Sequence, residues 1–137
     1  MATTLRPLRI LIVDDEHLIA SSLATVLRTH GFEAISVYSG YSALETAFAW
    51  LPDVVTSDIF TPGLNGVDAV LSMARRLPKA KFLLFSGHLP SHDSVSRTHE
   101  QGLRFVFFQK PIPPQSVVEY LRGCELELNV EREVASA

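Results

Sequence analysis

The feature that most constrains this chain's fold is the alternation of short apolar runs with longer stretches of helical periodicity. The apolar runs, rich in branched aliphatic and aromatic residues, are 8–13, 32–38, 54–57, 81–85 and 105–108. Between the first two, Ile19, Leu23 and Val26 recur at the spacing of one helix face. Five strand signals separated by helices predict an α/β fold in which a parallel sheet carries helices on both faces.

Turn-forming residues set the expected ends of the helices. Gly31 stands where a left-handed residue terminates the helix over 16–30. Ser42 and Glu45 match a capping box for a second helix, which runs to about Trp50 before Pro52. A third helix is expected over 67–77, a fourth over 91–101 with very few apolar residues, and a last one from Pro113 or Pro114.

Composition limits the classes of protein that fit. The 137 residues include 47% hydrophobic and 20% charged residues, which excludes a disordered chain and suits a single domain. The formal net charge of −3 gives no basic surface for nucleic acid or anionic membrane, and no apolar run approaches the length of a membrane span. We therefore expect a cytoplasmic protein with a domain over 1–128 and a polar, frayed tail over 129–137.

The single cysteine, Cys124, excludes an internal disulfide and a cysteine-built metal site. Its place near the end of the last helix predicts a small packing residue.

Polar residues follow four of the five predicted strands. Asp14 and Asp15 follow the first strand, Asp58 the third, Ser86 the fourth and Lys110 the fifth. Ligands of open parallel sheets bind beyond the carboxyl ends of the strands, so these side chains are expected at one edge.

Each residue also has a simpler interpretation. The three aspartates are common helix caps, and Ser86 alone reads as an ordinary loop hydroxyl. Lys110 lies between Phe107-Phe108 and Pro111-Ile112, so a half-buried position with an acidic partner is expected.

Taken together, these residues predict a particular chemistry. Three carboxylates at one edge repel each other unless a cation offsets them, and Mg²⁺ prefers such oxygen ligands. A carboxylate beside a divalent cation, a lysine and a hydroxyl is well placed to attack phosphorus and become an aspartyl phosphate.

From about residue 8 to 127 the sequence resembles the receiver domain of two-component response regulators. The motifs that carry the resemblance are Val13-Asp14-Asp15, Asp58 with Thr61-Pro62-Gly63-Leu64-Asn65-Gly66, Ser86-Gly87 and Lys110-Pro111. The resemblance implies a doubly wound, flavodoxin-like five-stranded parallel sheet with strand order 2-1-3-4-5.

The resemblance also implies roles for individual residues. Asp58 is the expected phosphoacceptor. Asp15, Asp58 and the backbone carbonyl of Phe60 are expected to ligate Mg²⁺ directly, and Asp14 through a bound water. Ser86 and Lys110 are expected to stabilise the phosphoryl group.

Ser86 and Phe107 occupy the positions of the family's hydroxyl and aromatic switch. Phe60 and His88, two residues after the acceptor and the hydroxyl, are expected to tune dephosphorylation. Phe107 replaces the tyrosine found in other members, and the interval from Ser86 to Lys110 is longer than is typical. The fourth-helix region is therefore the part least transferable from the family.

Three functions follow from these residues. The leading one is a phosphorylation-activated switch, not an enzyme acting on other substrates. It takes its phosphoryl group from a sensor histidine kinase or a histidine phosphotransfer protein and signals to a downstream protein. The alternatives are a receiver-like interaction module that works without phosphorylation and a magnesium-dependent phosphatase. The downstream target and the oligomeric state stay unassigned.

Overall fold

The computed structural model describes residues 6–58, 66–86 and 105–136. Its strands are β1 (Arg9–Val13), β2 (Glu33–Val37), β3 (Val54–Asp58), β4 (Lys81–Ser86) and β5 (Phe105–Gln109). Its helices are α1 (His17–Thr29), α2 (Gly40–Trp50), α3 (Gly66–Arg76) and α5 (Pro114–Ser136). The fourth helix predicted over 91–101 lies outside the described residues.

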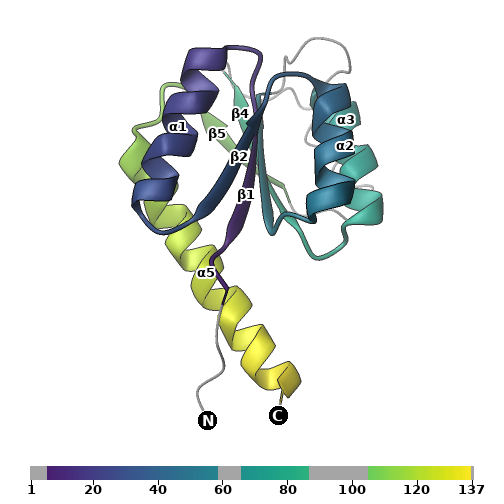
Figure 1. The fold of residues 1–137 in the computed structure, drawn as a ribbon, viewed down its shortest axis with the longest axis vertical. Coiled ribbons are helices and arrows are strands. Elements are labelled where there is room, and N and C mark those ends of the chain that lie inside the picture. Colours follow the sequence, from purple (N-terminus) through teal and green to yellow (C-terminus); the bar gives the residue numbers. More distant parts are fainter. Residues whose placement is uncertain (1–5, 59–65, 87–104, 137) are drawn as a thin grey trace.

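All strands pair in parallel in the order β2-β1-β3-β4-β5, which confirms the predicted sheet. Figure 1 shows α1 and α5 on one face of the sheet and α2 and α3 on the other. Both faces of the central strands are therefore covered, as the runs of branched aliphatic residues predicted.

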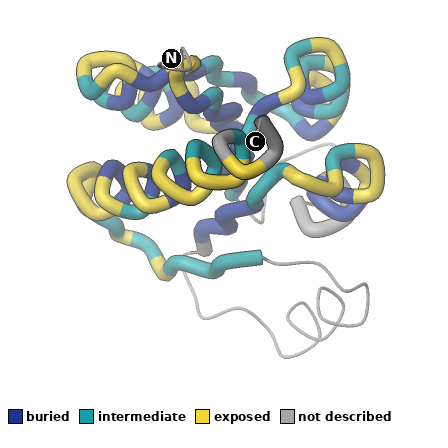
Figure 2. The backbone as a smooth tube through the Cα atoms, turned by 90° about the horizontal axis from the view of Figure 1, so that it is seen from below, coloured by how far each residue is buried: buried dark blue, intermediate teal, exposed yellow. Residues whose placement is uncertain are grey.

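The core is divided by the sheet into two layers. On β1, Ile10 and Ile12 pack with α1 and α5, whereas Leu11 and Val13 pack with α2 and α3. This split follows from the two-residue period of a strand. Cys124 is buried in the first layer, which confirms the prediction of a packing residue. Figure 2 shows the buried strands enclosed by helices with exposed outer faces.

The end of α1 was predicted from Gly31. Its φ is +88°, a conformation that glycine adopts at little cost, and its N–H donates to the carbonyl of Arg28 (3.0 Å).

Two predicted features are wrong. The cap of α2 is Ser39, whose hydroxyl oxygen accepts the N–H of Ser42 (3.1 Å), so the expected capping box at Ser42 and Glu45 does not begin the helix. The tail expected to fray over 129–137 is helical through Ser136. Two ion pairs hold this last part of α5 against the rest of the domain. Arg132 pairs with Asp53 (3.6 Å), and Glu127, five residues earlier in the helix, pairs with Lys81. The division into 1–128 and 129–137 stays a prediction.

Among the helices of the described ranges, none is both long enough and apolar enough to cross a membrane.

Candidate functional site

The parallel strands deliver the predicted polar residues to one edge of the sheet. Asp14 directly follows β1, Asp58 is the last residue of β3, and Lys110 directly follows β5. Because neighbouring strands run in the same direction, their carboxyl ends lie together. The N–H of Asp14 also bonds the carbonyl of Val37 at the end of β2 (3.1 Å), which fixes the backbone at this edge.

The three aspartates form one acidic cluster. Carboxylate oxygens of Asp14, Asp15 and Asp58 lie within 4.8 Å of one another. Asp14 is buried, with 5% of its surface exposed, whereas Asp58 is half-buried and Asp15 is exposed. The cluster therefore opens to solvent on the side of Asp15.

Lys110 holds two of these carboxylates. Its ammonium donates to Oδ2 of Asp58 (2.7 Å) and lies 3.7 Å from Oδ2 of Asp14. This confirms the prediction of a half-buried lysine with an acidic partner. Among the residues that the structure describes, this cluster sets three carboxyl groups against one ammonium, which gives it a surplus of acidic groups.

Burial and charge shift the pKa values of two of these groups. Burial raises the pKa of Asp14, and the charges of Asp58 and Asp15 add to it, although the N–H of Glu16 and the charge of Lys110 act in the opposite direction. Burial lowers the pKa of Lys110, but its hydrogen bond to Asp58 and the charges of Asp58 and Asp14 outweigh this, so the pKa lies above 10.5. Lys110 is therefore a cation throughout the physiological range.

Helix capping does not account for the aspartates. The cap residue of α1 is Glu16, which makes no side-chain capping bond, and the helix that follows Asp58 in the described part of the chain is α3, whose first residue is Gly66. Asp14 instead accepts the N–H of Glu16 at Oδ1 (3.0 Å), a local turn that holds its carboxylate in place. This role of the Glu16 N–H was not predicted, although an aspartate just before a helix is a signal for such a turn.

The cluster has the donor chemistry of a magnesium site. Mg²⁺ takes oxygen ligands, and one or two carboxylates with several waters are its usual protein environment. Two solvent-accessible carboxylates and a third from a buried residue satisfy that requirement, and the surplus negative charge favours a cation. The residues present therefore fit Mg²⁺.

The remaining predicted residues are placed in part. Ser86 is the last residue of β4 and pairs with Gln109, although its side chain lies outside the described part of the chain. Phe107 lies in β5 beside Leu84, half-buried against the layer formed by α2 and α3. Phe60 and His88 lie outside the described residues.

Comparison with known proteins agrees with this geometry. The family model described as "Response regulator receiver domain" matches residues 10–122. The chain is 33% identical over 114 residues to the chemotaxis protein CheY of Thermotoga maritima, covering 82% of this chain and 93% of that protein.

It is also 42% identical over 115 residues to the DNA-binding response regulator MtrA of Mycolicibacterium paratuberculosis. That match covers 84% of this chain and 50% of the relative, so the chain spans about half of this longer protein.

Among solved structures, a CheY-like receiver domain protein from Methanospirillum hungatei superposes with a TM-score of 0.82. The two chains are 22% identical, and the match covers 91% of this chain and 98% of that one, which shows the same fold. The chain thus belongs to the receiver domain family of two-component response regulators.

Proposed function

We propose that this receiver domain is a phosphorylation-activated switch whose acceptor is Asp58. The observation that supports this most strongly is the position of Asp58 at the end of β3, inside the acidic cluster and 2.7 Å from the ammonium of Lys110. The phosphoryl donor is a phosphohistidine of a sensor kinase or of a phosphotransfer protein. This donor follows from membership of the family.

The chemistry is a displacement at phosphorus. A carboxylate oxygen of Asp58 forms a bond to phosphorus as the bond from phosphorus to the imidazole nitrogen breaks, and the electron pair of that bond stays on the imidazole. Asp14, Asp15 and Asp58, with the backbone carbonyl of Phe60, would hold Mg²⁺. When bound, this ion neutralises charge that develops on the phosphoryl oxygens.

Lys110 has a partner before and after transfer. In the structure its ammonium donates to Asp58, and after transfer the new phosphoryl oxygens are the stronger acceptors. The ammonium would thus move from the carboxylate of Asp58 to the phosphoryl group. Because Lys110 directly follows β5, this movement would transmit the phosphorylation of Asp58 to the end of that strand. We place the switch in Ser86 of β4 and Phe107 of β5, two paired strands of which the second leads directly into Lys110.

The proposal also covers how the phosphorylated protein signals and how long it stays phosphorylated. The signal passes to a downstream protein through surfaces that change after phosphorylation, without a separate catalytic activity. From their places two residues after the acceptor and two after the hydroxyl, we expect Phe60 and His88 to tune dephosphorylation, with the phenyl ring of Phe60 slowing the attack of water on the aspartyl phosphate. Replacing Phe60 by asparagine is expected to accelerate loss of the phosphoryl group, measured by timed intact mass after removal of the donor.

The test of the acceptor is incubation with Mg²⁺ and phosphoramidate followed by intact mass measurement. Wild-type protein is expected to gain one phosphoryl group that hydroxylamine removes, as it does from acyl phosphates. Asp58→Asn is expected to gain none, whereas Glu45→Gln, which removes an exposed carboxylate on α2, labels normally. Equal labelling of Asp58→Asn would remove Asp58 from the role.

A further inference from the structure

A pocket of about 490 Å³ lies at the amino edge of the sheet, where the parallel strands begin. It is at the opposite end of the strands from the acidic cluster. Its apolar lining comes from the starts of the strands and from α5, which runs on past the start of β1 (Figure 1), and includes Leu8, Val54 and Leu128. The volume is in the range of sites for small molecules.

Basic side chains predominate among the charged residues of this lining. Five are basic: Arg6, Arg76, Lys79, Lys81 and Arg132. Two are acidic: Asp53 and Glu131. Even when Glu127 is added, which pairs with Lys81 from outside the lining, the basic residues exceed the acidic ones by two among the described residues. The whole chain, by contrast, has a formal net charge of −3, so the pocket gathers positive charge on an acidic protein.

Two of the basic residues have no acidic partner. Within the described part of the chain, ion pairs join Asp53 and Glu127 to the other three basic residues, but none involves Arg76 or Lys79. The guanidinium of Arg76 lies over the ring of Phe48 (3.8 Å from its centroid), which leaves the N–H groups at its rim able to donate. Both Arg76 and Lys79 are exposed, so their charged groups are accessible to a ligand.

These two residues and the apolar lining define the chemistry of a ligand. Guanidinium and ammonium groups form their strongest hydrogen bonds with phosphate and carboxylate oxygens. A phosphate monoester carries nearly two negative charges at neutral pH, because its second pKa is about 6, and it would match two unpaired basic groups. An apolar body attached to the phosphate would remove the apolar lining from water.

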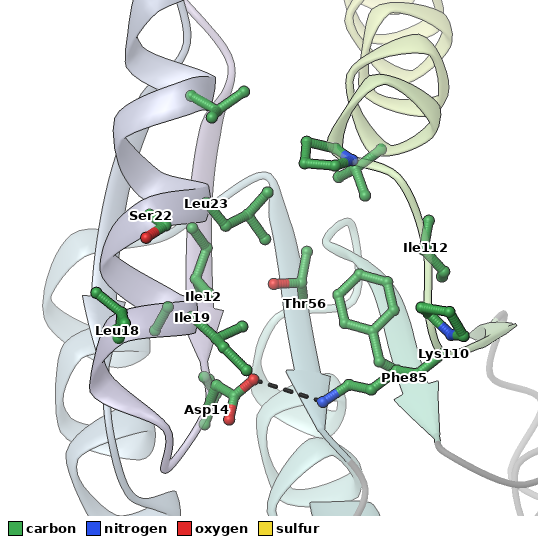
Figure 3. Close-up of a pocket in the computed structure, with 16 residues that line it drawn as sticks. Ile12, Asp14, Leu18, Ile19, Ser22, Leu23, Thr56, Phe85, Lys110 and Ile112 are labelled. Atoms are coloured by element: carbon green, nitrogen blue, oxygen red, sulfur yellow. Dashed lines mark ion pairs between the residues drawn. The ribbon is translucent and has the colours of Figure 1, made fainter.

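The other edge of the sheet does not compete for such a ligand in the absence of Mg²⁺. Figure 3 shows the ammonium of Lys110 directed at Asp14, and the same ammonium donates to Asp58. Carboxyl groups outnumber the ammonium in that described cluster, which disfavours an anion.

We propose that the pocket at the amino edge binds a small organic phosphate monoester, with its phosphate on Arg76 and Lys79 and its apolar body against the lining from the strands and α5. The proposal does not depend on phosphoryl transfer at Asp58, which lies at the other edge. A pocket of this volume suits one small molecule better than an extended acidic segment of a partner protein.

The test compares 2-naphthyl phosphate with 2-naphthol, which has the same rings without the phosphate. Each is titrated into ¹⁵N-labelled protein at pH 7.5 without Mg²⁺. We expect 2-naphthyl phosphate to give saturable shifts at the amides of Leu8, Lys79 and Leu128. Binding of 2-naphthol is expected to be about tenfold weaker, and inorganic phosphate, which lacks the rings, should also bind more weakly.

Two variants of equal charge separate the pocket from the general surface. Lys79→Gln removes one charge from the exposed turn between α3 and β4 and is expected to weaken 2-naphthyl phosphate about fivefold, leaving 2-naphthol unchanged. Arg75→Gln removes one charge from an exposed residue of α3 that is absent from the lining. Both probes should bind this control as they bind the wild type.

Three outcomes would overturn the proposal. The first is the absence of saturable shifts at the pocket amides. The second is an equal loss of affinity in Lys79→Gln and Arg75→Gln, which would reduce the attraction to a general effect of surface charge. The third is tighter binding of tetraglutamate than of 2-naphthyl phosphate at the same amides, which would assign the pocket to an acidic segment of a partner protein.

Discussion

The two ends of β3 carry aspartates of similar burial in opposite electrostatic settings. Asp53 immediately precedes the strand and Asp58 ends it, and their side chains are 11% and 16% exposed. Burial therefore does not distinguish them. The charge of the groups around them does.

At the amino-terminal edge of the strands, the negative charge of Asp53 is balanced by positively charged neighbours. Its two oxygens each accept from the guanidinium of Arg6 (2.8 Å), and Oδ2 also accepts the N–H of Arg9 (2.9 Å). Arg132 approaches Oδ1 at 3.6 Å. With one carboxylate facing two guanidinium groups, this cluster ties together β1, β3 and the end of α5 and has no need of an added cation.

At the carboxyl edge, among the residues that the structure describes, three carboxylates lie close to the ammonium of Lys110. The difference teaches that a charge surplus, rather than the mere presence of buried acids, separates the proposed phosphoryl-acceptor site from an ion pair that holds the fold together. Four experiments test this distinction.

The largest expected effect is on stability at the amino edge. Asp53→Asn weakens the bidentate pair with Arg6 and removes the negative charge that faces Arg6 and Arg132, so we expect a loss of about 2 kcal/mol. Asp58→Asn relieves repulsion among three carboxylates and should change the stability little or raise it. Urea denaturation with a magnesium chelator measures both. Equal losses in the two variants would remove the contrast between the edges.

The next effect concerns Mg²⁺ affinity. Asp15→Ala is expected to weaken binding about tenfold, because its exposed carboxylate is proposed as a direct ligand. Asp14→Ala should weaken it less, since its proposed contact is through water. Calorimetric titration gives both constants, and the reverse order would show that the two roles are exchanged.

A smaller effect is expected for Lys110. Lys110→Ala removes the cation from the cluster and should cost about 1 kcal/mol with chelator present. Saturating Mg²⁺ should largely cancel that loss, because the ion then offsets the same charges. Lys79→Ala serves as the control: Lys79 is an exposed lysine in the turn between α3 and β4, and its loss should respond to neither condition. A loss for Lys110→Ala that Mg²⁺ leaves unchanged would mean that the lysine is purely structural.

The smallest effect is expected for Arg132. Its ion pair with Asp53 is longer than that of Arg6, so Arg132→Ala should cost about 0.5 kcal/mol. The substitution should also lower helix content by fraying the last turns of α5, as seen by circular dichroism. Unchanged helix content would show that the pair of Arg132 with Asp53 is not needed for the last turns of α5 to be helical.

The strands and their order could be predicted because local and global signals agree. In β1 every buried residue is a branched aliphatic, and alternate residues serve the two core layers. The start of α2 was missed because Ser39 and Ser42 are both good caps, and only the observed bond from the N–H of Ser42 to Ser39 decides between them. The helical structure at the end of α5 could not be predicted, because it depends on the contact of Arg132 with Asp53, which is far away in the sequence.

The site was predictable for a related reason. Its main residues lie at the carboxyl ends of strands or directly after them: Asp14, Asp58 and Lys110. Once the strands are predicted, a parallel sheet brings these residues together. Within the described part of the chain, the hydroxyl of Thr56 in β3 is buried without a hydrogen-bond partner, which was not predicted because it depends on how α1 packs against the sheet. The distance between α1 and the sheet cannot be predicted from the periodicity of the sequence.

A magnesium titration followed by amide chemical shifts compares the two edges in one experiment. We expect saturable shifts at Asp14, Asp15, Asp58 and Lys110, and none at Asp53, because among the described residues the acidic surplus lies at the carboxyl edge. Shifts of equal size at Asp53, or no shift at Asp58, would contradict the conclusion that charge surplus marks the functional edge.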